Sequence, residues 1–290
     1  MKKFLLLFLS LVIIPFSLFG LEDMVAKKHR KRPIQKAAIY DCFMFFNELE
    51  LLEIRLNELY PYVDKFVLVE ACETHRKAEL KPFYYELNKE RYAQFADKII
   101  HIKLEEHYET SDSWARENWH RNQIMRGLTD CKPNDIILIS DVDEIVPGII
   151  IPQLDHELNK YKSIVCIQNM YRWFLNRSCN CVWGGTGIVR FKDLININPQ
   201  GVRVAARTGN MGKQWHVGWH FTSMGGYDKI MEKYRGIVEG YDYAISEEGW
   251  RAQANSHIFV PIDESYPKFI QDNIDYLIDL QMIDIDPTQT

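Results

Sequence analysis

The sequence predicts an α/β fold, with a Rossmann-like, mostly parallel sheet flanked by helices and a looser C-terminal half. Short apolar segments alternate with helical segments from residue 37 to residue 143, which is typical of strand–helix–strand units. One of these segments, residues 136–139, is wholly apolar and runs directly into a group of carboxylates. With 290 residues, 47% of them hydrophobic, the chain can bury a substantial core.

The first half of the chain reads as three strand–helix pairs that lead into a fourth strand. We expect strands at residues 37–43, 65–69, 99–104 and 136–139, and helices at residues 48–59, 82–96 and 114–128. In the first helix, Asn47 is a good N-cap with Glu50 three residues later, and leucines at 49, 52, 56 and 59 form one apolar stripe. The carboxyl ends of parallel strands meet at one edge of a sheet, where α/β proteins bind ligands.

Beyond Pro147 the pattern is less regular. We expect a strand at residues 163–168, then a stretch rich in Trp, Gly and Cys up to Gly187. Two further helices are expected at residues 227–238 and 266–280. This half shows neither an internal repeat nor a low-complexity segment.

The N-terminal residues predict a targeting segment. Residues 4–21 carry no charge and follow Lys2 and Lys3, so residues 1–21 are expected to be a signal peptide or a short membrane anchor. Residues 22–36 form a polybasic linker. We therefore expect membrane association or entry into the secretory pathway, on a side of the membrane that the sequence leaves open. Fractionation with N-terminal sequencing checks this, and a soluble cytosolic chain that still begins at Met1 would contradict it.

Charge and cysteine content exclude some functions. A net charge of −5 and a pI near 6.0 argue against a partner that is a nucleic acid polymer. The six cysteines contain no Cys-x-x-Cys pair, so a structural zinc site is not expected. Cys179 and Cys181 are either free thiols or, in an oxidising compartment, partners of distant cysteines. Asn176 begins a glycosylation sequon that is usable only in such a compartment.

Asp141, Asp143 and Glu144 follow the fourth strand and carry the clearest chemical information. Carboxylate oxygens suit Mn²⁺ or Mg²⁺, which bridge protein carboxylates to the phosphates of a substrate. The chain has neither a G-x-G-x-x-G nor a G-x-x-x-x-G-K-[ST] motif, so phosphate charge must be met by metal and basic side chains. Asp284 and Asp286 have the same spacing, but they lack a preceding apolar strand and serve as a comparison.

Several segments together resemble glycosyltransferase family 17, whose animal members are bisecting β-1,4-N-acetylglucosaminyltransferases. The Ser140–Pro147 segment and the Gly218–Phe221 segment are the most specific when taken jointly. The other matching pieces are Tyr40–Phe43, Asn47-Glu48, Leu51-Leu52, Arg55, Phe66–Glu70, Thr74, Lys81-Pro82, Trp114, Glu117, Arg121 and Tyr266-Pro267. They span nearly all of residues 37–290, which we interpret as one GT-A-like glycosyltransferase domain.

The resemblance implies a UDP-sugar donor, Mn²⁺ dependence, inversion at the anomeric carbon and a glycan acceptor. The donor sugar would be N-acetylglucosamine, and the enzyme a hexosyltransferase similar to the β-1,4-N-acetylglucosaminyltransferases. The segment between Tyr171 and Gly212 matches weakly, which leaves the acceptor open.

By position, the resemblance also suggests roles for individual residues. Asp143 would contact the metal, Asp141 the ribose or the metal, and His220 would be a third ligand or a phosphate donor. Arg121 would neutralise diphosphate charge or, alternatively, pair with Glu117 on its own helix.

The remaining roles are less defined by the pattern. Glu70 would contact the uridine or its ribose, and Glu144 would anchor the turn. Asp228 is our candidate for the general base, with Glu232 or Glu239 as substitutes. Trp173, Trp183 and Trp219 either stack on sugars or belong to the core.

Two other classes of protein stay open. An Asp-x-Asp after a strand also occurs in haloacid-dehalogenase-type phosphatases, in which Asp141 would be the nucleophile. A non-catalytic glycan-binding protein would keep the aromatic residues, but would not need both Asp141 and Asp143.

Overall fold

The computed structural model describes residues 36–238 and 246–285. The described residues from 37 onward form one compact unit. The predicted targeting segment at 1–21 and nearly all of the linker at 22–36 lie outside the described residues, as does Glu239. None of the helices in the described ranges is long and apolar enough to cross a membrane.

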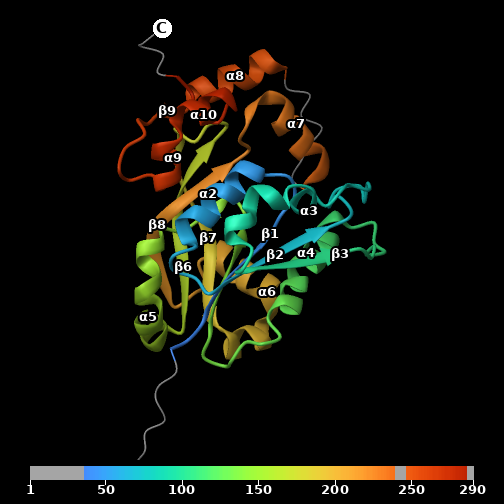
Figure 1. Cartoon of the computed structure of the whole chain (residues 1–290), viewed down its shortest axis with the longest axis vertical. Coiled ribbons are helices and arrows are strands. Elements are labelled where there is room, and N and C mark those ends of the chain that lie inside the picture. Colours follow the sequence, from blue (N-terminus) through green and yellow to red (C-terminus); the bar gives the residue numbers. More distant parts are fainter. Residues whose placement is uncertain (1–35, 239–245, 286–290) are drawn as a thin grey trace, which may run out of the picture. The chain divides into compact units, whose positions relative to one another are not determined.

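A single mixed sheet runs through the unit (Figure 1). Its strands are β1 (Ile39–Met44), β2 (Lys65–Ala71), β3 (Ile99–Leu104), β4 (Ile136–Asp141), β5 (Glu144–Ile145), β6 (Ser163–Arg172), β7 (Arg177–Arg190), β8 (Lys213–Thr222) and β9 (Ile258–Phe259). The strand order is β3-β2-β1-β4-β7-β6-β8-β5, with β9 paired to β7. The first four strands in this order are mutually parallel, and the fifth, β7, is antiparallel to β4.

Helices cover both faces of this sheet. They are α2 (Leu49–Leu59), α3 (Tyr84–Leu87), α4 (Ser113–Asn122), α5 (Leu154–Tyr161), α6 (Phe191–Arg207), α7 (Gly226–Gly236), α8 (Glu247–Ser256), α9 (Lys268–Asp272) and α10 (Ile274–Asp279), with 3-10 turns at Lys89–Phe95, Gln123–Gly127 and Gly148–Gln153. The α2, α3 and α5 helices share one apolar core. The α6 helix and the turn after α4 share a second core on residues of the opposite strand faces. The predicted α/β class, with a sheet flanked by helices, is confirmed.

The expected elements of the first half are present, with local differences. Glu48, and not Asn47, is the N-cap of α2, and no side chain caps that helix. The carboxylate of Glu48 instead accepts hydrogen bonds from the backbone of Phe46 and Asn47. The helices expected at 82–96 and 114–128 both break into an α-helix and a 3-10 turn.

The second half is more regular than its sequence indicates. The Gly-rich stretch belongs to β7, and α6 was not expected because Asn198 and Pro199 interrupt it. The glycines of β7 permit close packing: a Cβ at Gly184 would come within 2.5 Å of the Ala206 carbonyl oxygen on α6. The glycines of β7 therefore occur where this strand packs closely against α6.

Three other sequence features, the second Asp-x-Asp motif, the sequon and the cysteines, belong to the structural framework. Asp284 pairs with Arg177 at 2.7 Å, so this acid of the comparison motif has a structural role, and Asp286 lies outside the described residues. Asn176 is buried, and its side-chain amide bonds to the backbone of Asp284 in both directions. The sequon is therefore not accessible in this fold. All six cysteines are free, and Cys42 and Cys166 are buried.

Candidate active site

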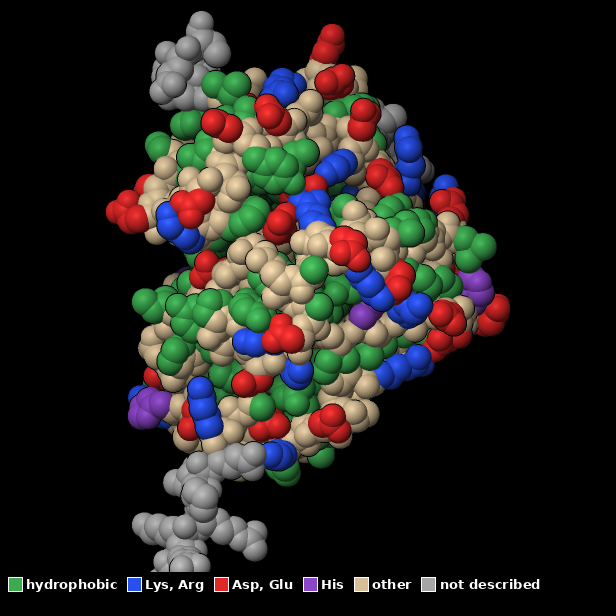
Figure 2. Space-filling model, viewed as in Figure 1, with side chains coloured by type: hydrophobic (Ala, Val, Ile, Leu, Met, Phe, Trp, Pro, Cys, Tyr) green, Lys and Arg blue, Asp and Glu red, His purple; other side chains and the backbone are tan. Residues whose placement is uncertain are grey.

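A cavity of about 430 Å³ lies at the carboxyl ends of β1, β2 and β4. The C-terminal half closes its other side with residues of β6, β8 and α7. Its charged and imidazole lining consists of Glu48, Glu73, His75, Lys81, Glu117, His120, Arg121, Asp141, Asp143, Arg172, Arg203, His220 and Lys233. On the face of the molecule shown in Figure 2, acidic and basic side chains are interspersed. The cavity, by contrast, concentrates titratable groups.

Arg55 of α2 holds the turn that follows β4. Its guanidinium donates to both carboxylate oxygens of Asp41 on β1, at 2.7 and 2.6 Å, and both side chains are buried. It also donates to the backbone carbonyls of Asp141 and Glu144, each at 2.9 Å, and to Ser140 Oγ at 2.6 Å. These charge-assisted bonds join the turn to a helix and a central strand.

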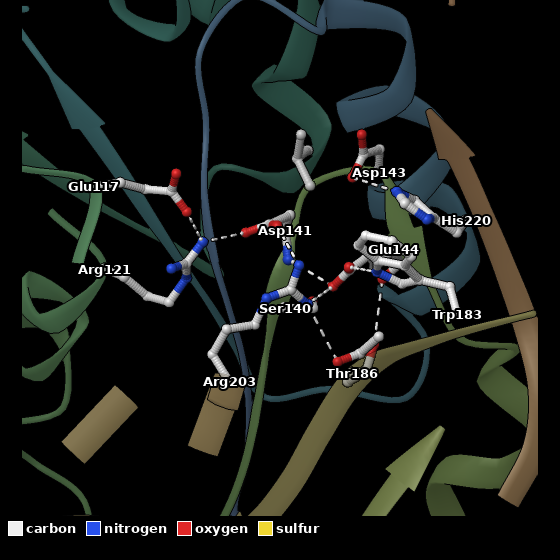
Figure 3. Close-up of polar contacts among 12 residues, drawn as sticks. Glu117, Arg121, Ser140, Asp141, Asp143, Glu144, Trp183, Thr186, Arg203 and His220 are labelled. Atoms are coloured by element: carbon white, nitrogen blue, oxygen red, sulfur yellow. Dashed lines mark hydrogen bonds and ion pairs between the residues drawn. The ribbon is translucent and has the colours of Figure 1, made fainter. Parts of the chain in front are cut away.

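Glu144 anchors the same turn from its other side, as expected. Its fully buried carboxylate accepts hydrogen bonds from the backbone N–H of Asp141 at 3.0 Å and from Arg203 at 2.6 Å. Trp183 Nε1 donates to the second oxygen at 2.6 Å (Figure 3). The turn is thus held by side chains from β7 and α6 as well as by Arg55.

Asp141 lies between two guanidinium groups. Arg203 donates to its Oδ2 at 2.6 Å and Arg121 to its Oδ1 at 3.1 Å (Figure 3). Burial would raise the pKa of Asp141, but the charges of Arg203 and Arg121 outweigh it and hold this pKa well below its usual range. Asp141 is therefore a permanent carboxylate at the cavity wall.

Arg121 makes the ion pair with Glu117 that one sequence interpretation expected, and its role toward a diphosphate stays a prediction. It pairs with Glu117, four residues earlier on α4, at 2.7 Å, and it also reaches Asp141 in the cavity. Arg203 was missed, because α6 was not predicted. Its two ion pairs, with Asp141 and Glu144, connect the cavity wall to the anchored end of the turn.

Asp143 is almost completely buried and faces a different cation. Lys233 Nζ lies 3.0 Å from its Oδ2 and 2.9 Å from Glu48 Oε1. His220 Nε2 lies 3.6 Å from Asp143 Oδ1. The register of β5 against β8 places Glu144 opposite His220, which brings the two sequence segments of the resemblance together. The ring of His220 also packs against Trp183 (Figure 3).

These residues fit a divalent cation that is only partly held by protein. Within residues 36–238 and 246–285, no group of three or more Asp, Glu, His or Cys side chains is arranged to hold a metal. Asp143 and His220 nevertheless offer an oxygen and a nitrogen to one cavity, and His220 Nδ1 is buried without a described partner. Burial lowers the pKa of His220, which favours the neutral, metal-binding imidazole. Mg²⁺-type sites commonly combine one or two carboxylates with water and substrate phosphates.

Glu70 is not in the cavity lining, contrary to expectation. It is buried on the other face of β2, where it accepts a hydrogen bond from the Tyr85 backbone and contacts His101 at 3.1 Å. The acid that reaches the cavity from this strand end is Glu73. Successive residues of a strand point to opposite faces, so the position of Glu70 near the end of the strand did not decide its direction.

His75 and His120 are cavity residues that the sequence did not indicate. Their rings lie 4.9 Å apart, and His120 Nε2 lies 3.4 Å from Glu73 Oε1 without a well-formed hydrogen bond. Burial, the largest cause, lowers the pKa of each to about 3. Both rings are therefore neutral near pH 7, and can accept or donate hydrogen bonds to a ligand.

The candidate bases Asp228 and Glu232 do not line the cavity. Both are exposed on α7, and Glu232 accepts a hydrogen bond from Tyr84. The same helix instead turns Lys233 and Tyr234 toward the cavity. The sequence predicted this helix but not the side that faces inward, because acids and lysines alternate along it.

The three tryptophans differ in position. Trp183 lines the cavity. Trp173 and Trp219 are buried in apolar clusters, so they belong to the core.

Comparisons with known proteins identify the family of this chain. Residues 21–168 match the model of glycosyltransferase family 17. A human β-1,4-mannosyl-glycoprotein 4-β-N-acetylglucosaminyltransferase is 24% identical over 80% of this chain and 53% of its own length. The Rattus norvegicus protein of the same name is 23% identical over 66% of this chain and 41% of its own length. The chain thus spans about half the length of these curated relatives, or less.

Similarity to solved structures is weaker. The structure of GalNAc-T7 with UDP, GalNAc and Mn²⁺ superposes with a TM-score of 0.42 and 13% identity, over 85% of this chain and 56% of that one. The family match is the firmer finding, because it covers about half of the chain and includes the turn with Asp141 and Asp143. The chain therefore belongs to glycosyltransferase family 17.

Proposed function

We propose that this chain is an inverting, metal-dependent transferase that moves N-acetylglucosamine from UDP-N-acetylglucosamine to a hydroxyl group of a glycan. The family membership supports sugar transfer, and the names of the two relatives support the sugar and a mannosyl-glycoprotein acceptor. The observation that carries the proposal is the position of Asp141 and Asp143 in one cavity with Arg121, Arg203 and Lys233. This combination suits a nucleoside diphosphate and a divalent cation.

In this mechanism the residues of the chain hold the donor and neutralise its leaving group. Asp143 and His220 would hold the metal, which supplies positive charge to the diphosphate when bound. Arg121 and Arg203 keep Asp141 ionised, and their guanidinium groups can meet phosphate oxygens or ribose from the cavity wall. The fixed turn between residues 140 and 144 keeps these groups in place before the donor arrives.

The proton of the acceptor hydroxyl needs a base that lines the cavity. Glu48, Glu73 and Glu117 meet this condition, whereas Asp228 and Glu232 do not. We place Glu117 first, because burial raises its pKa and a carboxylate with a raised pKa is the stronger base. A single displacement with this base inverts the anomeric carbon and requires no covalent intermediate.

The proposal is tested with the purified chain, UDP-sugars and a mannosyl-glycoprotein glycan. We expect transfer from UDP-N-acetylglucosamine in preference to other UDP-sugars, loss of transfer with a chelator, and a β-linked product by proton NMR. Glu117→Gln should bind UDP but fail to transfer. An α-linked product would contradict the proposed inversion at the anomeric carbon. Full activity in the presence of chelator would contradict the proposed metal dependence. If the chain binds no UDP-sugar, the proposed class of donor is wrong.

The alternative classes now have less support. Family membership removes the phosphatase interpretation, and both oxygens of Asp141 are engaged by arginines rather than free for attack. Glycan binding without catalysis does not require a cavity lined by both Asp141 and Asp143. Membrane association or secretion stays a proposal that rests on the uncharged segment at residues 4–21 and the basic residues that follow it.

A further inference from the structure

Lys233 occupies the position from which a cation would contact Asp143. Its ammonium group bridges Asp143 and Glu48 at 3.0 and 2.9 Å. The exposed fractions of the three side chains are 12%, 7% and 11%, so water screens these ion pairs weakly. A lysine side chain is a cation near neutral pH, and here two carboxylates hold its ammonium group in place.

This arrangement changes the local charge that a metal ion encounters at Asp143. A divalent cation that approaches Asp143 and His220 in the absence of donor encounters a carboxylate that is already neutralised. It also approaches the positive charge of Lys233, and like charges this close repel one another in a site that water screens weakly. A diphosphate carries negative charge into the same cavity and removes that repulsion.

We propose that Lys233 makes capture of the metal conditional on the donor: the divalent cation binds well only when a nucleoside diphosphate is present. The inference rests on the proposed function and adds to it a coupling between metal binding and donor binding. Lys233 is then a positioning residue that acts through Asp143. The metal and the diphosphate bind with positive coupling, and by linkage each strengthens the other equally.

If Lys233 has only a structural role, we expect a different effect of its substitution. If the ion pairs only fasten α7 to the turn after β4, removing the ammonium should reduce stability without raising metal affinity. Lys229 provides a matched control on the same helix. It is one turn earlier, is 43% exposed, and pairs with Glu50 at 2.9 Å outside the cavity lining.

The test measures Mn²⁺ binding by electron paramagnetic resonance, with and without UDP, in the full chain and its variants. Wild type should bind Mn²⁺ at least about tenfold more tightly with UDP than without it. Lys233→Met should bind Mn²⁺ without UDP about tenfold more tightly than wild type, and should lose most of the UDP effect. Lys229→Met should behave as wild type, and Lys233→Arg should keep the UDP effect because it keeps the charge.

The outcomes separate this inference from the proposed function. A folded Lys233→Met protein with unchanged or weaker Mn²⁺ affinity would overturn the inference and leave metal-dependent transfer intact. If Lys233→Met does not fold, the wild-type measurement decides, since equal Mn²⁺ affinity with and without UDP excludes the coupling. If no protein binds Mn²⁺ even with UDP, the metal dependence of the proposed function fails as well.

Discussion

The Asp143→Asn variant is expected to lose sugar transfer by a factor of about one hundred or more while remaining folded. Asparagine matches aspartate in size, so no void forms, and Lys233 keeps Glu48 as a partner. The substitution removes the negative charge that we expect to hold the metal, and metal-assisted charge stabilisation contributes several kcal/mol to catalysis. Calorimetry of UDP binding with and without Mn²⁺ measures the loss directly, beside the transfer assay.

Asp228→Asn is the matched control for this variant. Asp228 is an exposed acid on α7 outside the cavity lining, so its neutralisation should leave both UDP binding and transfer near the wild-type level. A folded Asp143→Asn protein that retains full Mn²⁺-dependent affinity for UDP would remove Asp143 from the metal site. Loss of activity in Asp228→Asn would instead restore the general base that the sequence suggested.

The Arg55→Met variant is expected to lose about 3–5 kcal/mol of unfolding free energy, because it leaves the buried carboxylate of Asp41 without its partner. It also removes four hydrogen bonds that hold the turn between residues 140 and 144. Since domains are commonly stable by roughly 5–15 kcal/mol, this is a large part of the total. Urea denaturation followed by circular dichroism gives the change.

Arg126→Met controls for the loss of an arginine as such. Arg126 and its partner Glu106 are 45% and 44% exposed, and exposed pairs contribute at most about 1 kcal/mol. If Arg55→Met unfolds at nearly the same urea concentration as Arg126→Met, the ion pair with Asp41 does not support the fold as argued above.

The parallel half of the sheet was predictable because its information is local. Apolar segments of strand length, leucines at helical spacing and acids at the end of the fourth strand are all visible within short windows. The prediction that Asp141 and Asp143 share a crevice follows from parallel topology alone. The second half was less predictable, since glycines in β7 and the Asn198-Pro199 interruption of α6 imitate loop sequence.

The other residues of the site could not be predicted from short sequence segments. Arg55 is one more arginine in an amphipathic helix, and its partners lie 14 residues before it and 85 or more residues after it. The position of Arg203 could not be predicted, because it lies on α6, which the sequence pattern does not indicate. Glu70 and Glu73 follow one another closely on and after a single strand, yet only Glu73 faces the cavity.

The amino-acid sequence alone was enough to establish the α/β class, the family resemblance and the acid pair at the end of a buried strand. Folding settled which charges meet: two arginines at Asp141, Lys233 at Asp143, and neither Asp228 nor Glu232 at the cavity. The physical reason is that apolar periodicity specifies which face of an element is buried on average. Charged side chains that enter a cavity do so only where distant elements supply the opposite charge, and those pairings exist only in the packed tertiary structure.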